Sequence, residues 1–549
     1  MKYNKISITI VAFFAIILLE SCAKKLDLFP QNDFTPEKAY ATAAGYKSVL
    51  AKIYGTLSST GNQGPAGSAD ITGGLDEGKQ VAFLRGLFNA QELPTDEAVV
   101  AWNDETIKDF HEMDWTSADF YLKGWYARPI YNITLINEYL RETTDAKLAE
   151  RGIAGADGAE IKKSIAEVRF LRAFNYWVMI DLFGKSTFIT EADLIGTALP
   201  KEISRVNLFN YVETELKAID GQLAVAKTAE YGRVDQSAAW SLLARMYLNA
   251  QVYTGVARNT DAITYANKVI SAGYTLAQTN VNGYQAYHQL FMADNHLRKD
   301  EIIWAINCDG LRTQSYGNTS FLIHCAAGDD ATEYGAGGGW YGYRTTSSLV
   351  NLFSDKTGAT DKRAMFTTSS FGTGNAQLAI TDIGDFNTGP HVKKFVNKKT
   401  DNAAANDPDK NFADIDFPVF RLSEMYLIYA EAFLRGGTGA DATTAIAHLN
   451  KIRFRAYNNS YGPGNIGQVG TGDLNLQFIL DERGRELYWE CHRRTDLVRY
   501  NLLTTGTYLW PWKGGVASGT AVNSKYNIYP VPAVNRSANP NLTQNTDYQ

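Results

Sequence analysis

Apolar stripes of helical period recur along the chain in pairs, and they constrain its fold more than any other feature. In the segment Arg421–Arg435 the apolar residues lie three or four positions apart and form one continuous face; they are Leu422, Met425, Tyr426, Tyr429, Ala432 and Phe433. Gly436 and Gly437 end this segment, and a second helical segment runs from about Ala440 to Ala456. This pattern predicts an antiparallel helix pair.

Two more helix pairs are predicted in the first half of the chain. They are Gln236–Ala250 with Asp261–Ser271, and Ile161–Phe183 with a segment from about Asn207 to Val225. Repeated pairs of this kind indicate tetratricopeptide-like stacking. Stretches rich in Gly, Asn, Thr and Ser separate the pairs, chiefly 55–80, 308–345, 355–416 and 457–473. Because such long loops are usually functional, we expect a mainly α fold, with a helix-pair scaffold and loop-rich insertions that carry recognition.

The composition excludes several classes of protein. The chain of 549 residues has 53 Lys and Arg against 59 Asp and Glu, a net charge of −6, so a non-specific nucleic-acid binder is not expected. A hydrophobic share of 45% with 20% charged residues is typical of a globular protein. The 31 tyrosines and 10 tryptophans are more unusual. Their rings combine an apolar face with a polar group, which suits binding surfaces as well as cores.

The N-terminus has the pattern of a bacterial lipoprotein signal. Lys2 and Lys5 precede an apolar run, Ile6–Leu19, whose 14 residues are too few to span a bilayer and are typical of a secretory signal. Leu19-Glu20-Ser21-Cys22 then resembles a lipobox, although Glu20 is unusual in it. Residues 1–21 are therefore predicted to be removed, Cys22 to be lipidated and 22–36 to form a tether. The alternative is an ordinary signal peptide with an incidental cysteine.

Several blocks spread over nearly the whole chain resemble the SusD family of outer-membrane glycan-binding lipoproteins. They are AEVRFLRAFNYW at 166–177, FRLSEMYLIYAEA at 420–432, ERGRELYWE at 482–490, YPVP at 529–532 and NPNLTQN at 539–545. One departure is Cys491, which stands where the family usually has glycine.

The resemblance implies a non-catalytic, lipid-anchored protein of the outer membrane that faces the cell exterior. It implies one SusD-like domain over 37–549, with glycan-binding regions chiefly at 55–105 and 308–416. It also implies a partner, a SusC-like TonB-dependent transporter, to which the captured glycan is passed.

The resemblance is closest to the starch-binding member that gives the family its name. NAQELPTDE at 89–97, LFMADN at 290–295 and WPWKGG at 510–515 are similar to that member. Three aromatic positions that bind α-glucan there match Trp102, Tyr316 and Trp340 here. Arg85 and Asp76 match residues that hydrogen-bond sugar hydroxyls, and a further polar contact matches Asn103 or Glu105. The resemblance thus implies binding of starch and malto-oligosaccharides.

The physical properties of an α-1,4-glucan fit this expectation. The polymer is helical, so a curved row of rings can follow it, and ring faces attract the C–H groups of the sugars while excluding water. Trp340 follows three glycines, Gly337–Gly339, which allow the backbone to present a large ring to solvent. The alternative is that the three rings fill the protein core, as most large aromatic residues do.

Two charged clusters are not assigned a catalytic role, and the first of them is interpreted as structural. The block Glu482–Arg499 suggests carboxylate–guanidinium pairs three and four positions apart on a helix. Four aspartates, Asp407, Asp409, Asp414 and Asp416, could bind calcium, although a solvated acidic loop is the default. No other cofactor is expected.

Cys308, Cys325 and Cys491 are predicted to be buried free thiols.

Three other functions stay open from the sequence. The same architecture could bind a different glycan. A glycoside hydrolase could use carboxylates near Trp102, namely Glu92, Asp96, Glu97 and Asp104, although sequence cannot show two of them across a bond. The chain could also be a purely structural part of a transporter.

Overall fold

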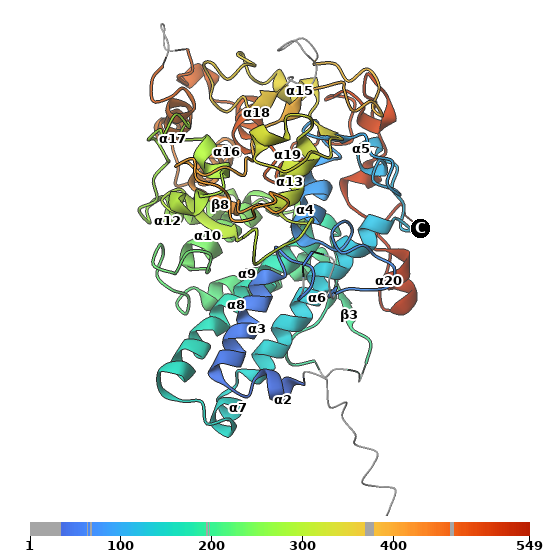
Figure 1. Ribbon diagram of the computed structural model, residues 1–549, viewed down its shortest axis with the longest axis vertical. Helices are drawn as coiled ribbons and strands as arrows, with labels where there is room; N and C mark the ends of the chain where they lie inside the picture. Colours follow the sequence, from blue (N-terminus) through green and yellow to red (C-terminus); the bar gives the residue numbers. More distant parts are fainter. Residues whose placement is uncertain are drawn as a thin grey trace, which may run out of the picture.

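Helices dominate the computed structural model, which describes residues 35–62, 64–65, 69–193, 196, 198–367, 378–461 and 466–548 (Figure 1). The predicted signal peptide, the lipidation site Cys22 and nearly all of the tether lie outside these residues. No helix of the described ranges has the length and apolar character needed to cross a bilayer.

The N-terminal half of the chain contributes a group of helices whose long members pack side by side (Figure 1). The longest, α8, contacts α3, α6 and α9, and its central and C-terminal residues are almost all buried. The helices of this group are α2 Pro36–Ala39, α3 Ala43–Gly55, α6 Phe120–Glu142, α7 Asp145–Glu150, α8 Gly155–Leu182 and α9 Arg205–Ile219.

A second group of helices continues the stack. Helix α10 packs on α12, α12 packs on α16, and α16 packs on α17 and α18. The helices are α10 Gln236–Leu248, α11 Ala250–Thr254, α12 Asn259–Ile270, α16 Leu422–Leu434, α17 Ala442–Ala456, α18 Leu476–Leu487 and α19 Arg493–Arg499. All three predicted helix pairs are confirmed, as α8 with α9, α10 with α12 and α16 with α17. The contact of α12 with α16 joins segments that the sequence keeps about 150 residues apart.

Short elements lie between these helices. The remaining helices are α4 Phe83–Glu92, α5 Asp109–Glu112, α13 Thr319–Ala326, α14 Ala331–Tyr334, α15 Ser347–Val350 and α20 Ala533–Ala538, with 3-10 turns at 288–291, 295–298, 471–473, 513–515 and 524–527. The strands are β1 Val99–Val100, β2 Ser186–Phe188, β3 Lys201–Ile203, β4 Ile302–Ile306, β5 Tyr343–Arg344, β6 Phe366–Thr367, β7 His391–Val392 and β8 Phe417–Arg421. They form four antiparallel pairs, β1 with β5, β2 with β3, β4 with β8 and β6 with β7.

The stretch 308–345, which was predicted to be a loop, contains α13, α14 and β5. Asn318 begins α13, because its side chain accepts a hydrogen bond from the backbone N–H of Ser320. Phe321, Leu322 and Ile323 on this helix are fully buried. The short apolar run is thus a core helix, and the loops on either side of it are held in place.

The charged block at 482–499 is structural, as predicted, but most of its partners are not neighbours on a helix. Pairs three positions apart occur, such as Glu482 with Arg485. Arg421 instead reaches across from the end of β8 and pairs with Glu486 and Glu490 at 2.5 and 2.6 Å. The Arg421 side chain is only 1% exposed. The prediction of local pairing was therefore wrong for the core of this cluster, where the ion pairs join separate segments.

The acidic stretch 407–416 also differs from expectation. Asp407, Asp414 and Asp416 are buried, and only Asp409 is exposed. Their carboxylates accept hydrogen bonds from backbone N–H groups: Asp407 from Asn411 and Phe412, Asp414 from Asn406 and Gly310, and Asp416 from Cys308. The expectation of a solvated acidic loop is therefore wrong for three of the four aspartates. Backbone N–H groups supply hydrogen bonds to these three buried carboxylates.

The three cysteines are buried and free, as predicted. Cys491 has a φ of +66°, in the left-handed region that favours glycine. This conformation explains why the position suits glycine. The Cys491 N–H donates to Glu92 Oε1 at 2.6 Å, which holds the turn against α4.

Removal of Arg421 should destabilise the protein severely. Arg421→Ala leaves Glu486 and Glu490 buried with fewer cationic partners, so we expect the free energy of unfolding to fall by about 3–5 kcal/mol. Chemical denaturation of the purified mature chain measures this change. Lys162→Ala is the control, because Lys162 pairs with Asp145 at 2.7 Å but is 53% exposed. That control should cost less than about 1 kcal/mol, and an equal loss in both variants would contradict the account.

Burial of Glu92 should make stability depend on pH. Desolvation raises the pKa of Glu92 to about 7, and burial together with the charge of Glu92 raises the pKa of Glu97. Because the folded state favours the protonated form, wild-type protein should lose stability as the pH rises from about 4.5 to above 7, relative to Glu92→Gln. Thermal unfolding of both proteins across this range tests the expectation, and a pH-independent difference would contradict it.

Candidate functional site

The pairing of β1 with β5 brings two distant loops together. Val99 pairs with Arg344 and Val100 with Tyr343, and the N–H of Ala101 donates to the carbonyl of Gly342 at 2.8 Å. Trp102 directly follows this ladder, and Trp340 precedes it. Their ring centroids therefore lie 6.3 Å apart, with the ring planes inclined by 53°.

Glycine is required where the first of these rings meets the other loop. Gly342 has a φ of +99°, and a Cβ atom added there would lie 2.1 Å from Trp102 Nε1. The missing side chain thus lets Trp102 lie directly against the backbone of the Trp340 loop.

Trp340 is fixed from beneath by α13. Its N–H donates to the carbonyl of His324 at 2.8 Å, and its ring stacks on the His324 imidazole with centroids 4.7 Å apart and planes 15° from parallel. The two nitrogens of His324 lie 2.6 and 2.9 Å from the carbonyl oxygens of Gly338 and Asn411. His324 thus joins the loop of Trp340 to a third segment and covers one side of the indole.

Tyr316 completes the row from the turn before α13. Its ring meets Trp340 edge to face, with centroids 5.6 Å apart and planes inclined by 61°, and it also packs on Phe412 at 5.0 Å. The N–H of Arg85 on α4 donates to the carbonyl of Gly317 at 3.0 Å and holds the turn. The spatial order is therefore Trp102, Trp340, Tyr316. All three rings are half-buried, so they are not simply core residues.

These rings form one wall of a hollow of about 430 Å³. We call it the aromatic hollow; its lining residues are Pro65, Asp76, Glu77, Gly78, Lys79, Arg85, Trp102, Asp104, Tyr316 and Trp340.

Arg85 is the buried cation of this site. Its guanidinium carbon lies 4.4 Å from the centre of the Phe321 ring and 5.7 Å from that of Trp102, within cation–π range. Nη1 donates to the carbonyl of Gly78 at 3.0 Å, whereas Nε has no hydrogen-bond partner among the described residues. The residue is only 4% exposed. A buried donor without a partner is unusual, and here it belongs to a side chain that lines a hollow.

Five of the six site residues predicted from the sequence line the aromatic hollow: Asp76, Arg85, Trp102, Tyr316 and Trp340. Asn103 is exposed and does not line it. The alternative, Glu105, accepts a hydrogen bond from Gln80 instead.

Sequence reasoning missed several residues of the site. Asp104, which the sequence suggested only as a hydrolytic carboxylate near Trp102, lines the hollow and lies 3.5 Å from Lys79, a pair that no spacing in the sequence indicates. Glu77 also lines the hollow and was not predicted, although Asp76 beside it was. His324 lies behind Trp340, and only its position on the apolar helix α13 could have suggested a packing role.

The carboxylates considered for hydrolysis do not gather at the hollow. Glu92, Asp96 and Glu97 are fully buried in the scaffold. Asp96 is held by Arg493, and Glu97 accepts the N–H of Trp489 at 3.0 Å. Of the four carboxylates, only Asp104 lines the hollow. What the site offers is therefore apolar ring faces beside charged donors and acceptors, an arrangement suited to recognising a molecule with both apolar faces and hydroxyl groups.

Comparison with known proteins agrees with this description. The sequence profile of the SusD family matches residues 300–548. Starch-binding protein SusD of Bacteroides thetaiotaomicron is 33% identical over 572 aligned residues, which cover 96% of each chain.

Solved structures have the same fold. A SusD superfamily protein from Bacteroides thetaiotaomicron superposes with a TM-score of 0.67 at 18% identity, over 92% of this chain and 99% of that chain. Surface glycan-binding protein A from Bacteroides fluxus gives a TM-score of 0.66 at 18% identity, over 92% of this chain and 100% of that chain. The SusD-like fold class expected from the sequence is thus confirmed. The chain belongs to the SusD family of non-catalytic glycan-binding proteins.

Proposed function

We propose that this protein captures starch and malto-oligosaccharides, which are α-1,4-glucans, in the aromatic hollow. The observation that carries the proposal is the continuous contact of Trp102, Trp340 and Tyr316, each ring inclined to the next by more than 50°. In this proposal the inclined rings follow the bend of the helical α-1,4-glucan. The relative named starch-binding protein SusD supports the choice of glycan.

Each part of the hollow has a role in this proposal. The ring faces pack on the C–H groups of successive glucose units and exclude water. Arg85, whose side chain lines the hollow, supplies guanidinium donors to sugar hydroxyls. Asp76, which is exposed at the rim, supplies acceptors. The charges of Lys79 and Asp104 offset each other, so the rim suits a neutral polymer.

We further propose that the protein acts at the outer surface of the outer membrane. Lipidation of Cys22 would anchor it to the outer membrane, facing outward, since each buried methylene contributes about 0.8 kcal/mol. The captured glycan would then pass to a SusC-like, TonB-dependent transporter. Holding a polymer next to a pore raises its local concentration, so a modest affinity at one site suffices.

Loss of the central ring should weaken glycan binding most clearly. Trp340→Ala removes the ring that contacts both others, so we expect affinity for amylose to fall about 30-fold, equivalent to about 2 kcal/mol. Affinity electrophoresis of the mature chain through gels containing starch measures the effect as lost retardation.

Trp240→Ala is the matched control, because Trp240 is also half-buried but lies on α10, outside the hollow. It should migrate like the wild type, and circular dichroism should show both variants folded. Wild-type retardation by another glycan but not by starch would contradict the choice of substrate. Unchanged retardation of Trp340→Ala would contradict the location of the site.

The anchor and the partner can be tested in cells. Wild-type protein should sediment with outer membranes and co-purify with a TonB-dependent barrel, whereas Cys22→Ala should appear in the soluble fraction because the acyl chains are lost. Fractionation followed by affinity purification measures both properties. Cys22→Ala that still sediments in full would contradict the anchor, and wild-type protein that brings down no barrel would contradict the partner.

A further inference from the structure

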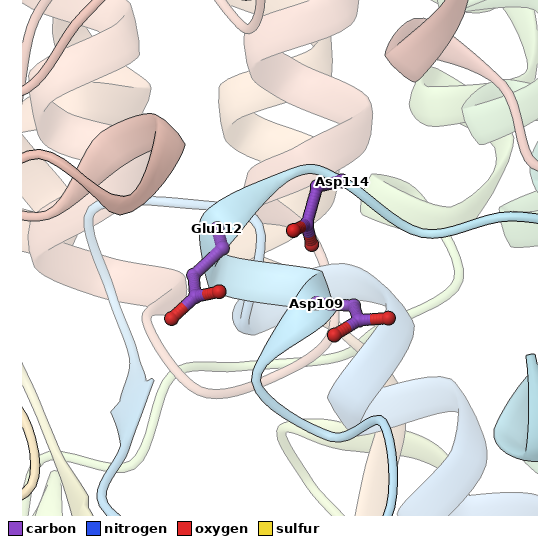
Figure 2. Close-up of side chains that lie close together, drawn as sticks. All are labelled: Asp109, Glu112 and Asp114. Atoms are coloured by element: carbon purple, nitrogen blue, oxygen red, sulfur yellow. The ribbon is translucent and has the colours of Figure 1, made fainter.

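Three carboxylates converge at a turn outside the aromatic hollow (Figure 2). Asp109 and Glu112 lie on the short helix α5, and Asp114 follows it. One oxygen from each lies within 4.8 Å of the others. No lysine or arginine within the described ranges forms an ion pair with any of the three. The cluster therefore gathers three carboxylates that no cation contacts directly in the described part of the chain, although Lys108 lies near enough to act on Glu112 through its charge.

The backbone holds the cluster together. Met113, at the end of α5, has a φ of +54°, which turns the chain back so that the N–H of Asp114 donates to the carbonyl of Asp109 at 3.1 Å. On the other side, Glu112 packs on the backbone of Gly515, where an added Cβ would lie 3.6 Å from Glu112 Cγ.

A buried imidazole gives a second, independent indication of a ligand. The side chain of His111 is only 1% exposed, and neither ring nitrogen has a hydrogen-bond partner in the part of the chain that the structure describes. Its Nε2 faces the cluster at 3.8 Å from Glu112 Oε1. Buried polar groups are nearly always hydrogen-bonded, so the two unpartnered nitrogens of His111 beside the carboxylates are an exception to the usual pattern. A small movement of Glu112 would let Nε2–H donate to its carboxylate.

We propose that Asp109, Glu112 and Asp114 bind a calcium ion. Ca²⁺ takes six to eight oxygen ligands at about 2.3–2.6 Å, so oxygens on opposite sides of the ion lie up to about 5 Å apart, which agrees with the observed spread. Water completes the coordination on the open side. His111 orients Glu112 from behind, as outer hydrogen-bond donors do for metal-bound carboxylates. The bound ion would fix α5 against the 513–515 turn, which Glu112 already contacts.

Other divalent ions fit less well. Mg²⁺ requires near-ideal octahedral geometry at about 2.0–2.1 Å and keeps most of its water. Zn²⁺ prefers nitrogen and sulfur ligands, and the converging atoms here are all carboxylate oxygens.

Isothermal titration calorimetry of the metal-stripped mature chain with CaCl₂ tests the proposal. Wild-type protein should bind one ion saturably, and Asp109→Asn/Asp114→Asn should bind at least about tenfold more weakly. Asp145→Asn/Glu150→Gln is the control, because it removes two exposed carboxylates outside the cluster and should leave binding unchanged. Equal Ca²⁺ binding by wild type and the cluster variant, or none by wild type, would overturn the proposal.

Two further experiments test the same site: Tb³⁺ luminescence, which needs no calorimetry, and the Ca²⁺ affinity of a His111 variant. Tb³⁺ luminescence excited through the adjacent Trp115 should appear in wild-type protein, disappear on addition of Ca²⁺ and be absent from the cluster variant. His111→Phe should reduce Ca²⁺ affinity several-fold while the protein stays folded by circular dichroism. Zn²⁺ binding tighter than Ca²⁺ at this cluster, or unchanged affinity in His111→Phe, would overturn the assignment of the ion or of the imidazole.

Discussion

A bidentate ion pair buried between Arg493 and Asp96 connects the helical scaffold to the site. Arg493 Nε and Nη2 donate to the two Asp96 oxygens at 2.7 and 2.8 Å, although the residues are 397 positions apart. Because both donors are engaged, the pair fixes orientation as well as distance. Asp96 lies three residues before β1, so the pair fixes where β1 begins. The pairing of β1 with β5 then sets Trp102 beside Trp340.

Buried ion pairs of the same kind also connect β8, α16, α18 and α19. Arg421 at the end of β8 binds Glu486 and Glu490, and Arg499 on α19 binds Glu431 on α16 through two bonds of 2.7 and 2.8 Å. Buried pairs contribute little net stability compared with apolar packing, but breaking one is costly. We infer that their value here is to define one arrangement of α16, α18 and α19. The loops of the aromatic hollow are built on that arrangement.

The sequence predicts the parts of this molecule that depend on local pattern. The pair α16 and α17 follows from apolar spacing and from Gly436 and Gly437, which act within a few residues. A structural role could be predicted for the charged block at 482–499. Its ion-pair partners could not, because they come from other segments of the chain. The helix α13 was missed because its apolar run is short and is flanked by residues typical of loops.

In the candidate site, likewise, the three aromatic residues could be predicted from the sequence but their arrangement in space could not. Trp102, Tyr316 and Trp340 could be chosen by resemblance, and Gly337–Gly339 pointed to a presented ring. Their order in space could not be predicted, because Trp340 lies between the other two only through the β1–β5 ladder and the stack on His324. The pairing of Lys79 with Asp104 likewise exists only in the folded protein.

A crystal structure of the mature chain with maltoheptaose tests the central claim most directly. The account predicts consecutive glucose units packed along Trp102, Trp340 and Tyr316, in that order, with sugar hydroxyls within hydrogen-bond distance of the Arg85 guanidinium. A maltoheptaose molecule bound elsewhere on the protein, with the three rings untouched, would contradict it.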